Sequence, residues 1–177
     1  MEYRFVHHWQ YEPGLQEEAI LQTAVDLVNC KRGKNFILEA ASFISKHTTA
    51  TYVVVGLISE DSQRVHTCVF LKHGVPLPNF TYPLNGTPCD AVLTQRFCFY
   101  PSKVTESFPD DQELKEFNIE SYLGSVLTSE ENELLGLVAI MDEKTIDNAA
   151  FAEHLILILS PAIEEELAKY KTNMSKF

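Results

Sequence analysis

The chain has 177 residues, 45% of them hydrophobic and 22% charged, which is the composition of one folded domain and excludes a disordered segment. Its formal net charge of −11 argues against nucleic acid as a partner, because an acidic surface repels the phosphate backbone. No apolar run is long enough to span a bilayer and no secretion signal opens the sequence, so we expect a cytoplasmic protein without membrane insertion.

Helical patterns come first along the chain. Residues 1–14 have no clean period and form a leader that ends at Pro13-Gly14. Residues 15–32 form an N-terminal helical segment, in which apolar residues up to Asn29 fall on one side of a helix. The stripe over residues 36–47 is clearer and predicts a second helix with one core-facing side.

The central part of the sequence predicts β-structure. Thr51–Ile58 is rich in β-branched and aromatic residues, which favours a strand that is buried on both faces. Polar turns then separate the segments that follow, as in consecutive hairpins. Strands are predicted at Arg64–Lys72, Asn79–Leu84, Phe97–Tyr100, Glu120–Thr128 and Glu133–Met141.

A long helix is predicted from about Asn148 to Tyr170, followed by a tail over residues 171–177. Its apolar stripe includes Leu155, Ile158 and Ala162. Helices at both ends of an antiparallel sheet indicate an α+β fold.

Several phrases of the sequence resemble the GAF family, and they occur in the family's order over about residues 33–170. Tyr82-Pro83-Leu84-Asn85-Gly86-Thr87-Pro88-Cys89 is similar to the phrase Y-x-L-x-G-T-P-C of GAF domains fused to bacterial sensor kinases and cyclic-dinucleotide enzymes. The other similar phrases are Gly33–Ile37, Ala50–Gly56, Phe108–Leu114, Tyr122–Leu127 and Leu135–Asp142. The resemblance implies a central antiparallel sheet, with the terminal helices on one face and a ligand-type cavity on the other.

The resemblance also implies a function in signal transduction. We expect a sensory or regulatory domain that binds a small molecule or a partner and is not an enzyme. Its terminal helices would pair in a homodimer, through Leu155, Ile158 and Ala162, and lead to an output domain such as a histidine kinase or cyclic-dinucleotide enzyme. The phrases of cyclic-nucleotide-binding and bilin-attaching members are missing, so the residues identify neither the ligand nor a cofactor. An interaction module with a filled cavity is the alternative.

Five residues are candidate ligand contacts, because they lie in the segments that line the cavity of GAF domains: Tyr82, Thr87, Cys89, Phe99 and Tyr122. Aromatic walls with a few polar groups are typical of small-molecule sites. The same residues also fit a structural interpretation, since aromatic residues fill cores and Thr87 can cap a helix that starts at Pro88.

The four cysteines, Cys30, Cys68, Cys89 and Cys98, lack a CxxC spacing and are expected to be reduced. A thiol-based methionine sulfoxide reductase using Cys89 and Cys98 is a further alternative, since a helix N-terminus beside Cys89 would favour its thiolate. No other catalytic residues are predicted. His66 shares a strand face with Cys68, but no second pair of ligands is near, so no metal site is predicted.

Overall fold

The structure is a computed structural model that describes residues 11–30 and 32–174. Most of the predicted leader, one residue of the N-terminal helical segment and the last three residues of the tail therefore lie outside the described residues. In chain order the elements are α1 (Leu15–Asn29), α2 (Phe36–His47), β1 (Tyr52–Ile58), β2 (Arg64–Lys72), β3 (Val75–Pro76), β4 (Thr81–Pro83), α3 (Pro88–Gln95), β5 (Phe97–Tyr100), α4 (Val104–Ser107), α5 (Gln112–Glu116), β6 (Ser121–Thr128), β7 (Leu134–Asp142) and α6 (Ala149–Met174).

The predicted helices and strands are all present, and most of their ends agree to within one residue. The strand expected over Asn79–Leu84 shortens to β4, and Val75–Pro76, where no strand is predicted, form the short strand β3, which pairs with β2. The last helix continues to Met174, beyond the boundary at residue 170, because its sequence contains no helix-stopping glycine there.

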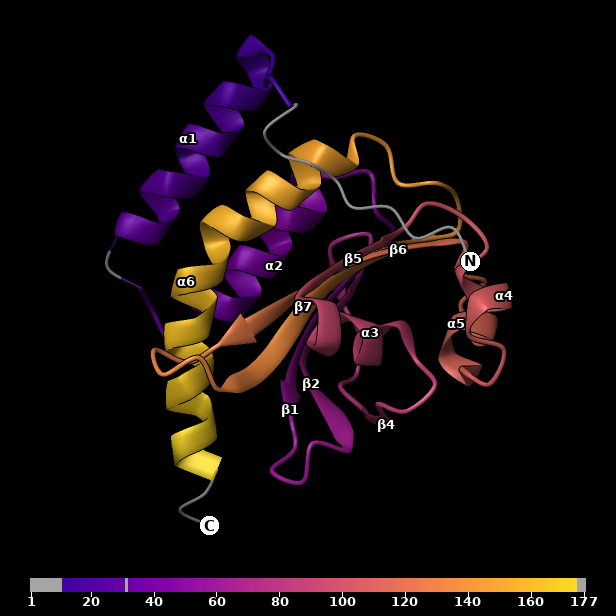
Figure 1. Cartoon of the computed structure of the whole chain (residues 1–177). Coiled ribbons are helices and arrows are strands. Elements are labelled where there is room, and N and C mark those ends of the chain that lie inside the picture. The colour runs from indigo at the N-terminus through magenta and orange to yellow at the C-terminus, as the bar shows by residue number, and fades with distance from the viewer. Residues whose placement is uncertain (1–10, 31, 175–177) are drawn as a thin grey trace.

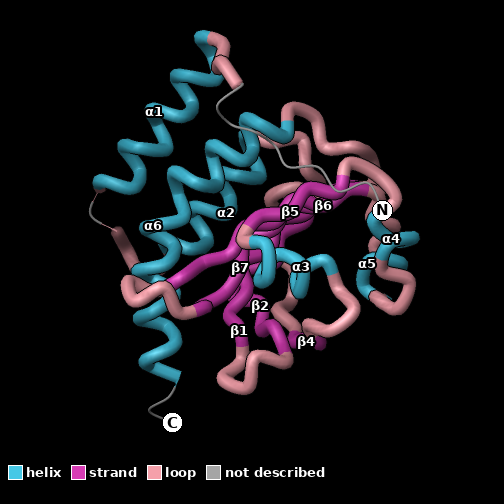
Figure 2. The backbone as a smooth tube through the Cα atoms, in the orientation of Figure 1, coloured by secondary structure: helices cyan, strands magenta, loops and turns pink. Residues whose placement is uncertain are grey.

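The strands form one seven-stranded sheet in the order β3-β2-β1-β7-β6-β5, with β4 also paired to β2. Every pairing is antiparallel. Helices α1, α2 and α6 lie on one side of the sheet, and α3, α4 and α5 lie on the other (Figures 1 and 2). This arrangement confirms the predicted α+β class with both terminal helices on one face.

The sheet separates two hydrophobic cores, and alternation along its strands divides the residues between them. All seven residues of β1 are buried, as a strand covered on both faces requires. The helix-side core is built on Val53, Leu71, Leu123, Leu127, Val138, Ile140, Leu155, Leu159 and Ile163, among others. The cavity-side core contains Tyr52, Val54, Phe70, Tyr82, Cys89, Val92, Cys98, Tyr100, Leu114, Tyr122 and Ala139, among others.

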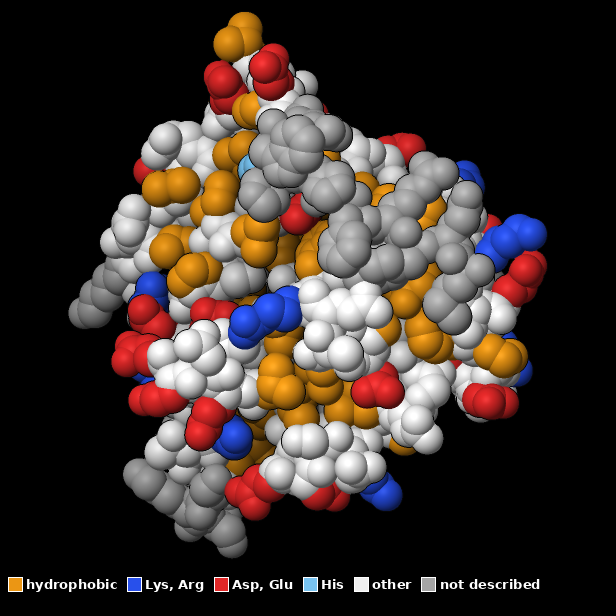
Figure 3. All heavy atoms as spheres, viewed as in Figure 1, with side chains coloured by type: hydrophobic (Ala, Val, Ile, Leu, Met, Phe, Trp, Pro, Cys, Tyr) orange, Lys and Arg blue, Asp and Glu red, His pale blue; other side chains and the backbone are white. Residues whose placement is uncertain are grey.

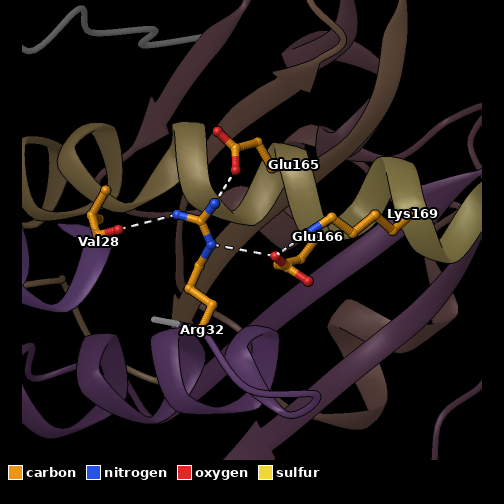
Figure 4. A network of polar contacts seen from close by, with 5 residues as sticks. All are labelled: Val28, Arg32, Glu165, Glu166 and Lys169. Carbon is orange, nitrogen blue, oxygen red and sulfur yellow. Dashed lines mark hydrogen bonds and ion pairs between the residues drawn. The ribbon is translucent and has the colours of Figure 1, made fainter. Parts of the chain in front are cut away.

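A polar network links the loop between α1 and α2 to the C-terminal half of α6 (Figure 4). The Arg32 guanidinium contacts the carboxylate of Glu165 and lies 3.3 Å from that of Glu166, and it also donates to the backbone oxygen of Val28. Lys169 lies 2.8 Å from the same Glu166 carboxylate. The network therefore links α1 and the segment that leads into α2 to α6.

Candidate functional site

A cavity of about 40 Å³ lies between the sheet and the segments that cover its second face. Its wall comes from strands β1, β2, β4, β6 and β7, from α3, and from the region of α5. The lining residues are Val54, Phe70, Phe80, Tyr82, Pro88, Cys89, Asp111, Glu113, Leu114, Phe117, Ile119, Tyr122, Ala139 and Met141. Most of this wall is hydrophobic, with a few polar groups at defined positions, as in small-molecule sites.

A buried polar trio, which consists of Tyr82, Cys89 and Tyr122, forms one part of the wall. The Cys89 Sγ atom lies 3.2 Å from the hydroxyl oxygen of Tyr82 and 3.2 Å from that of Tyr122. The three residues come from β4, α3 and β6 and are 8%, 6% and 1% exposed. Because a sulfur atom accepts hydrogen bonds weakly, both phenol groups keep much of their capacity to bond a ligand.

Burial fixes the protonation state of this trio. It raises the pKa of the Cys89 thiol to about 11 and raises those of Tyr82 and Tyr122 well above their usual value. All three groups are therefore protonated at neutral pH. The expected lowering of the Cys89 pKa by the helix N-terminus is wrong, because desolvation outweighs the hydrogen bonds that favour the thiolate.

Gly124 makes room for the Tyr122 hydroxyl. Residues two apart on a strand share a face, so the Tyr122 ring lies along the position of the missing side chain. A Cβ atom on Gly124 would lie 2.7 Å from the Tyr122 hydroxyl oxygen and 2.8 Å from a methyl of Val92 on α3. The glycine thus allows Tyr122 and α3 to approach each other closely enough for Tyr122 to reach Cys89.

The cavity also has a carboxyl group in its wall. Asp111 is only 7% exposed, and one of its carboxylate oxygens accepts a hydrogen bond from the backbone nitrogen of Leu114, which caps α5. Burial is the largest cause that raises the pKa of Asp111, to about 6, and its neighbour Glu113 raises it further. At neutral pH the cavity therefore has a carboxylate in contact with largely apolar surroundings.

The covering segment, residues 103–118, contains α4 and α5 and is bracketed by two residues with left-handed backbone conformation. Lys103 has φ 56° and Asn118 has φ 53°, a region that residues other than glycine seldom occupy. Leu114 lies inside the segment and Phe117 near its end, and both line the cavity. The Phe117 ring packs against Tyr52 and Phe70, at centroid distances of 5.3 Å and 5.5 Å.

The structure brings three of the five predicted contacts together, namely Tyr82, Cys89 and Tyr122. Thr87 is buried beside them but does not line the cavity, and its hydroxyl donates to the backbone oxygen of Leu84. Thr87 occupies the N-cap position of α3, yet its side chain makes no capping hydrogen bond.

The prediction of Phe99 as a ligand contact is wrong, because its side chain lies in the helix-side core and not at the cavity. The reason is the alternation of β5, where Cys98 and Tyr100 face the cavity side. On the neighbouring strand β6, Leu123 is paired with Phe99 and Tyr122 is paired with Tyr100. Directly paired residues share a face of the sheet.

Sequence reasoning missed the acidic and aromatic wall made by Asp111, Glu113 and Phe117. In the sequence the two carboxylates fit favourable charges at a helix start equally well, and Asp111 does cap α5. A signal was available in the apolar residues around them, Phe108, Leu114 and Phe117, which must face a core and carry Asp111 with them.

No site for a metal emerges among residues 11–30 and 32–174, where no three His, Cys, Asp or Glu side chains come together as ligands would. None of the helices in this described part combines the length and the apolar character needed to cross a membrane.

Solved structures with the same fold were found, although no protein-family model and no curated protein match the sequence. The GAF domain of an Acinetobacter phosphoenolpyruvate-protein phosphotransferase superposes with a TM-score of 0.66 at 12% identity, over 92% of this chain and 99% of that one. The free methionine-R-sulfoxide reductase of Neisseria meningitidis gives 0.68 at 12% identity, over 93% and 97%. The chromophore-binding domain of an R. palustris bacteriophytochrome gives 0.63 at 13% identity, over 88% and 64%. The chain therefore has the GAF-domain fold.

Proposed function

We propose that this chain, which has the GAF-domain fold, is a sensory or regulatory domain whose cavity binds a small molecule. The observation that carries the proposal is the polar trio in the cavity wall. Buried hydroxyl and thiol groups are costly in an apolar core unless they are hydrogen-bonded, and aliphatic side chains would fill the same space without that cost. A trio held at a cavity instead supplies hydrogen-bonding groups that orient a ligand.

Binding requires the wall to yield, because about 40 Å³ has room for only a few water molecules. The covering segment is the part best suited to move. It ends at two left-handed residues, Lys103 and Asn118, and it places Leu114 and Phe117 over the cavity. A ligand that displaces these two side chains would favour an open form of the segment, as any ligand with unequal affinity for two forms must.

The first experiment is native mass spectrometry of the gently purified protein, followed by a thermal-shift screen of small metabolites. We expect a bound mass or a ligand that raises the melting temperature, and a smaller shift for Tyr122→Phe. Tyr170→Phe is the matched control, because it also removes one phenol oxygen but from an exposed residue of α6. A bare mass with no stabilising compound would contradict the ligand proposal.

The second part of the proposal is that α1 and α6 transmit the signal, by pairing in a homodimer that leads to an output domain such as a histidine kinase or cyclic-dinucleotide enzyme. Of the three predicted contacts, Leu155 and Ala162 are fully buried within the chain and do not offer a surface for a dimer, whereas Ile158 is half-buried against the helix-side core. The large apolar residues that these helices expose are instead Leu15 and Val25 on α1 and Leu157, Tyr170 and Met174 on α6. Hydrophobic side chains are visible along α1 on one face of the molecule (Figure 3).

The dimer is tested by light scattering of the double variant Val25→Glu with Leu157→Glu. We expect a monomer with an unchanged fold, since both side chains are exposed. Val75→Glu on β3 is the control, because it adds a charge at another exposed apolar residue. A native chain that is already monomeric would contradict this part of the proposal.

An interaction module is the second candidate function, and the small volume of the cavity favours it. In that case the aromatic side chains would be the permanent filling of a core. A methionine sulfoxide reductase activity, for which the Neisseria enzyme is named, has less support here if it is to use the Cys89 thiol. Burial raises the pKa of Cys89 to about 11, whereas thiol chemistry requires the thiolate. A turnover of methionine sulfoxide that is lost in Cys89→Ser would restore that alternative.

A further inference from the structure

We infer that the cavity selects a cation, namely a small molecule with an ammonium or similar positively charged group on a short apolar body. This inference rests on the proposed function, because it names the ligand class for the same cavity. It is carried by the charge of the wall, by the aromatic faces around that charge, and by the surroundings of Asp111.

The charged residues of the cavity wall all have the same sign. They are Asp111 and Glu113, and no lysine, arginine or histidine among residues 11–30 and 32–174 lines the cavity. The ion pairs between described residues join Arg32 to Glu165 and Glu166, Lys103 to Glu106, and Lys169 to Glu166. Among the described residues, none of these ion pairs neutralises Asp111 or Glu113. A cationic ligand would supply the counter-charge.

The negative field of these carboxylates reaches the cavity interior. Beyond burial, which is the largest cause of both shifts, Asp111 and Glu113 raise the pKa of the Tyr82 phenol and Asp111 raises that of the Cys89 thiol. Tyr82 comes from β4 and Cys89 from α3, so the field spans the cavity from the covering segment to the opposite wall. An anion placed between them would be repelled by two carboxylates in a region of low dielectric constant.

Aromatic rings make the remaining wall suitable for a cation. Phe80 packs against Phe70 and Tyr82 at centroid distances of 5.3 Å and 5.6 Å, and Phe117 closes the group from the covering segment. Ring faces carry negative electrostatic potential and attract ammonium groups, most strongly where water is excluded. Carboxylate and rings thus favour the same ligand charge, while the apolar residues of the wall favour a short hydrocarbon body.

Asp111 also makes binding depend on pH. The titratable groups that face its carboxyl are Glu113 on the same segment, which opposes its ionisation, and Tyr82 and Cys89 across the cavity, which are protonated and neutral at neutral pH. In the free protein its pKa is about 6, and a bound cation would lower it. By linkage, the affinity for a cation should fall as the pH drops below about 6, whereas the affinity for a neutral molecule should not.

Three probes of equal length test the charge preference in solution by protein-observed NMR: n-propylammonium, n-propanol and propionate. A ligand of this size reaches at best millimolar to submillimolar affinity. We expect n-propylammonium to perturb residues of the cavity wall and to bind about tenfold more tightly than n-propanol. Propionate should bind most weakly.

Asp111→Asn should reduce the affinity for n-propylammonium by about tenfold and remove its pH dependence, while leaving n-propanol unchanged. Asn retains an acceptor for capping α5, so the variant keeps its local structure. Asp110→Asn is the matched control, because it removes the same charge from an exposed neighbour that does not line the cavity.

The outcomes separate this inference from the proposed function. Equal binding of n-propanol and n-propylammonium, unchanged by Asp111→Asn, would overturn the selection of a cation but leave a ligand-binding cavity. Phe117→Ala enlarges the cavity. It is included because a closed wall could keep all three probes out and so conceal a preference for the cation. If none of the probes binds either the native protein or Phe117→Ala, both the inference and the ligand-binding function are overturned.

Discussion

The two faces of the sheet are built from different residues. The helix-side core is dominated by aliphatic side chains, and the tyrosines that are buried in the described part of the chain, Tyr52, Tyr82, Tyr100 and Tyr122, all belong to the cavity-side core. Cys89, Cys98 and the carboxyl of Asp111 are on that second side as well. The same sheet thus supports a densely packed aliphatic core on its helix side and a core with polar groups beside a cavity on its other side.

This difference indicates that the helix-side core mainly stabilises the fold and that the cavity side mainly serves binding. Aliphatic residues gain free energy in proportion to the area they bury and need no partners. Phenol, thiol and carboxyl groups lose hydration on burial and must be compensated. Because the cavity side accepts that cost at several positions, it is the side where substitutions should change binding more than stability.

The largest contrast is expected from truncating one leucine in each core. Leu155 is fully buried between α6 and the sheet, so Leu155→Ala should cost about 2–5 kcal/mol of unfolding free energy. Leu114→Ala should cost less, about 1–2 kcal/mol, because the covering segment can settle into the space. Urea unfolding of both variants measures the difference. Equal costs would show that the cavity side is packed as rigidly as the helix side.

Gly124→Ala tests whether the cavity side depends on one close approach. The new Cβ would clash with the Tyr122 hydroxyl and with Val92, so we expect a loss of about 1–3 kcal/mol. Cys89 should also lose its contact with Tyr122, which NMR of the Cys89 region can detect. Gly33→Ala is the control, since a Cβ there meets nothing within 4 Å. A neutral Gly124→Ala would show that Tyr122 is free to move.

The sequence predicts the sheet and its helices well because hydrophobic periodicity reports the burial of each strand and helix directly. It predicts the cavity less well, because a cavity is defined by which face of each strand a residue occupies. Phe99 shows this limit, since Tyr122 and Phe99 can both face the cavity only if the strand register differs by one residue. Asp111 shows another, because a carboxylate that caps a helix has the same local sequence whether it faces solvent or a cavity.

Asp111→Asn tests whether the buried carboxylate of Asp111 lowers the free energy of unfolding. The folded-state pKa of about 6 lies above the usual 3.8, so between these values the folded protein binds more protons than the unfolded chain. Stability from this group is therefore highest below pH 3.8 and is lost as the pH rises through about 6. At pH 7.5 we expect Asp111→Asn to be more stable than the native chain by about 1–2 kcal/mol. Unfolding curves at pH 5 and 7.5 measure this, and Asp110→Asn should leave the pH dependence unchanged.

Arg32→Lys probes the polar rim of the helix side, where we expect the smallest effect. Lysine keeps the charge but lacks the planar fork that reaches Glu165, Glu166 and the Val28 carbonyl together (Figure 4). Because the carboxylate of Glu165 is exposed while the pair of Arg32 with Glu166 is only partly buried, the loss should be about 0.5–1 kcal/mol and should shrink at high salt. Unfolding in low and high salt measures it. A loss as large as that of Leu155→Ala would mean that charge, rather than apolar packing, holds α1 and α6 together, and the separation between the two faces of the sheet would no longer hold.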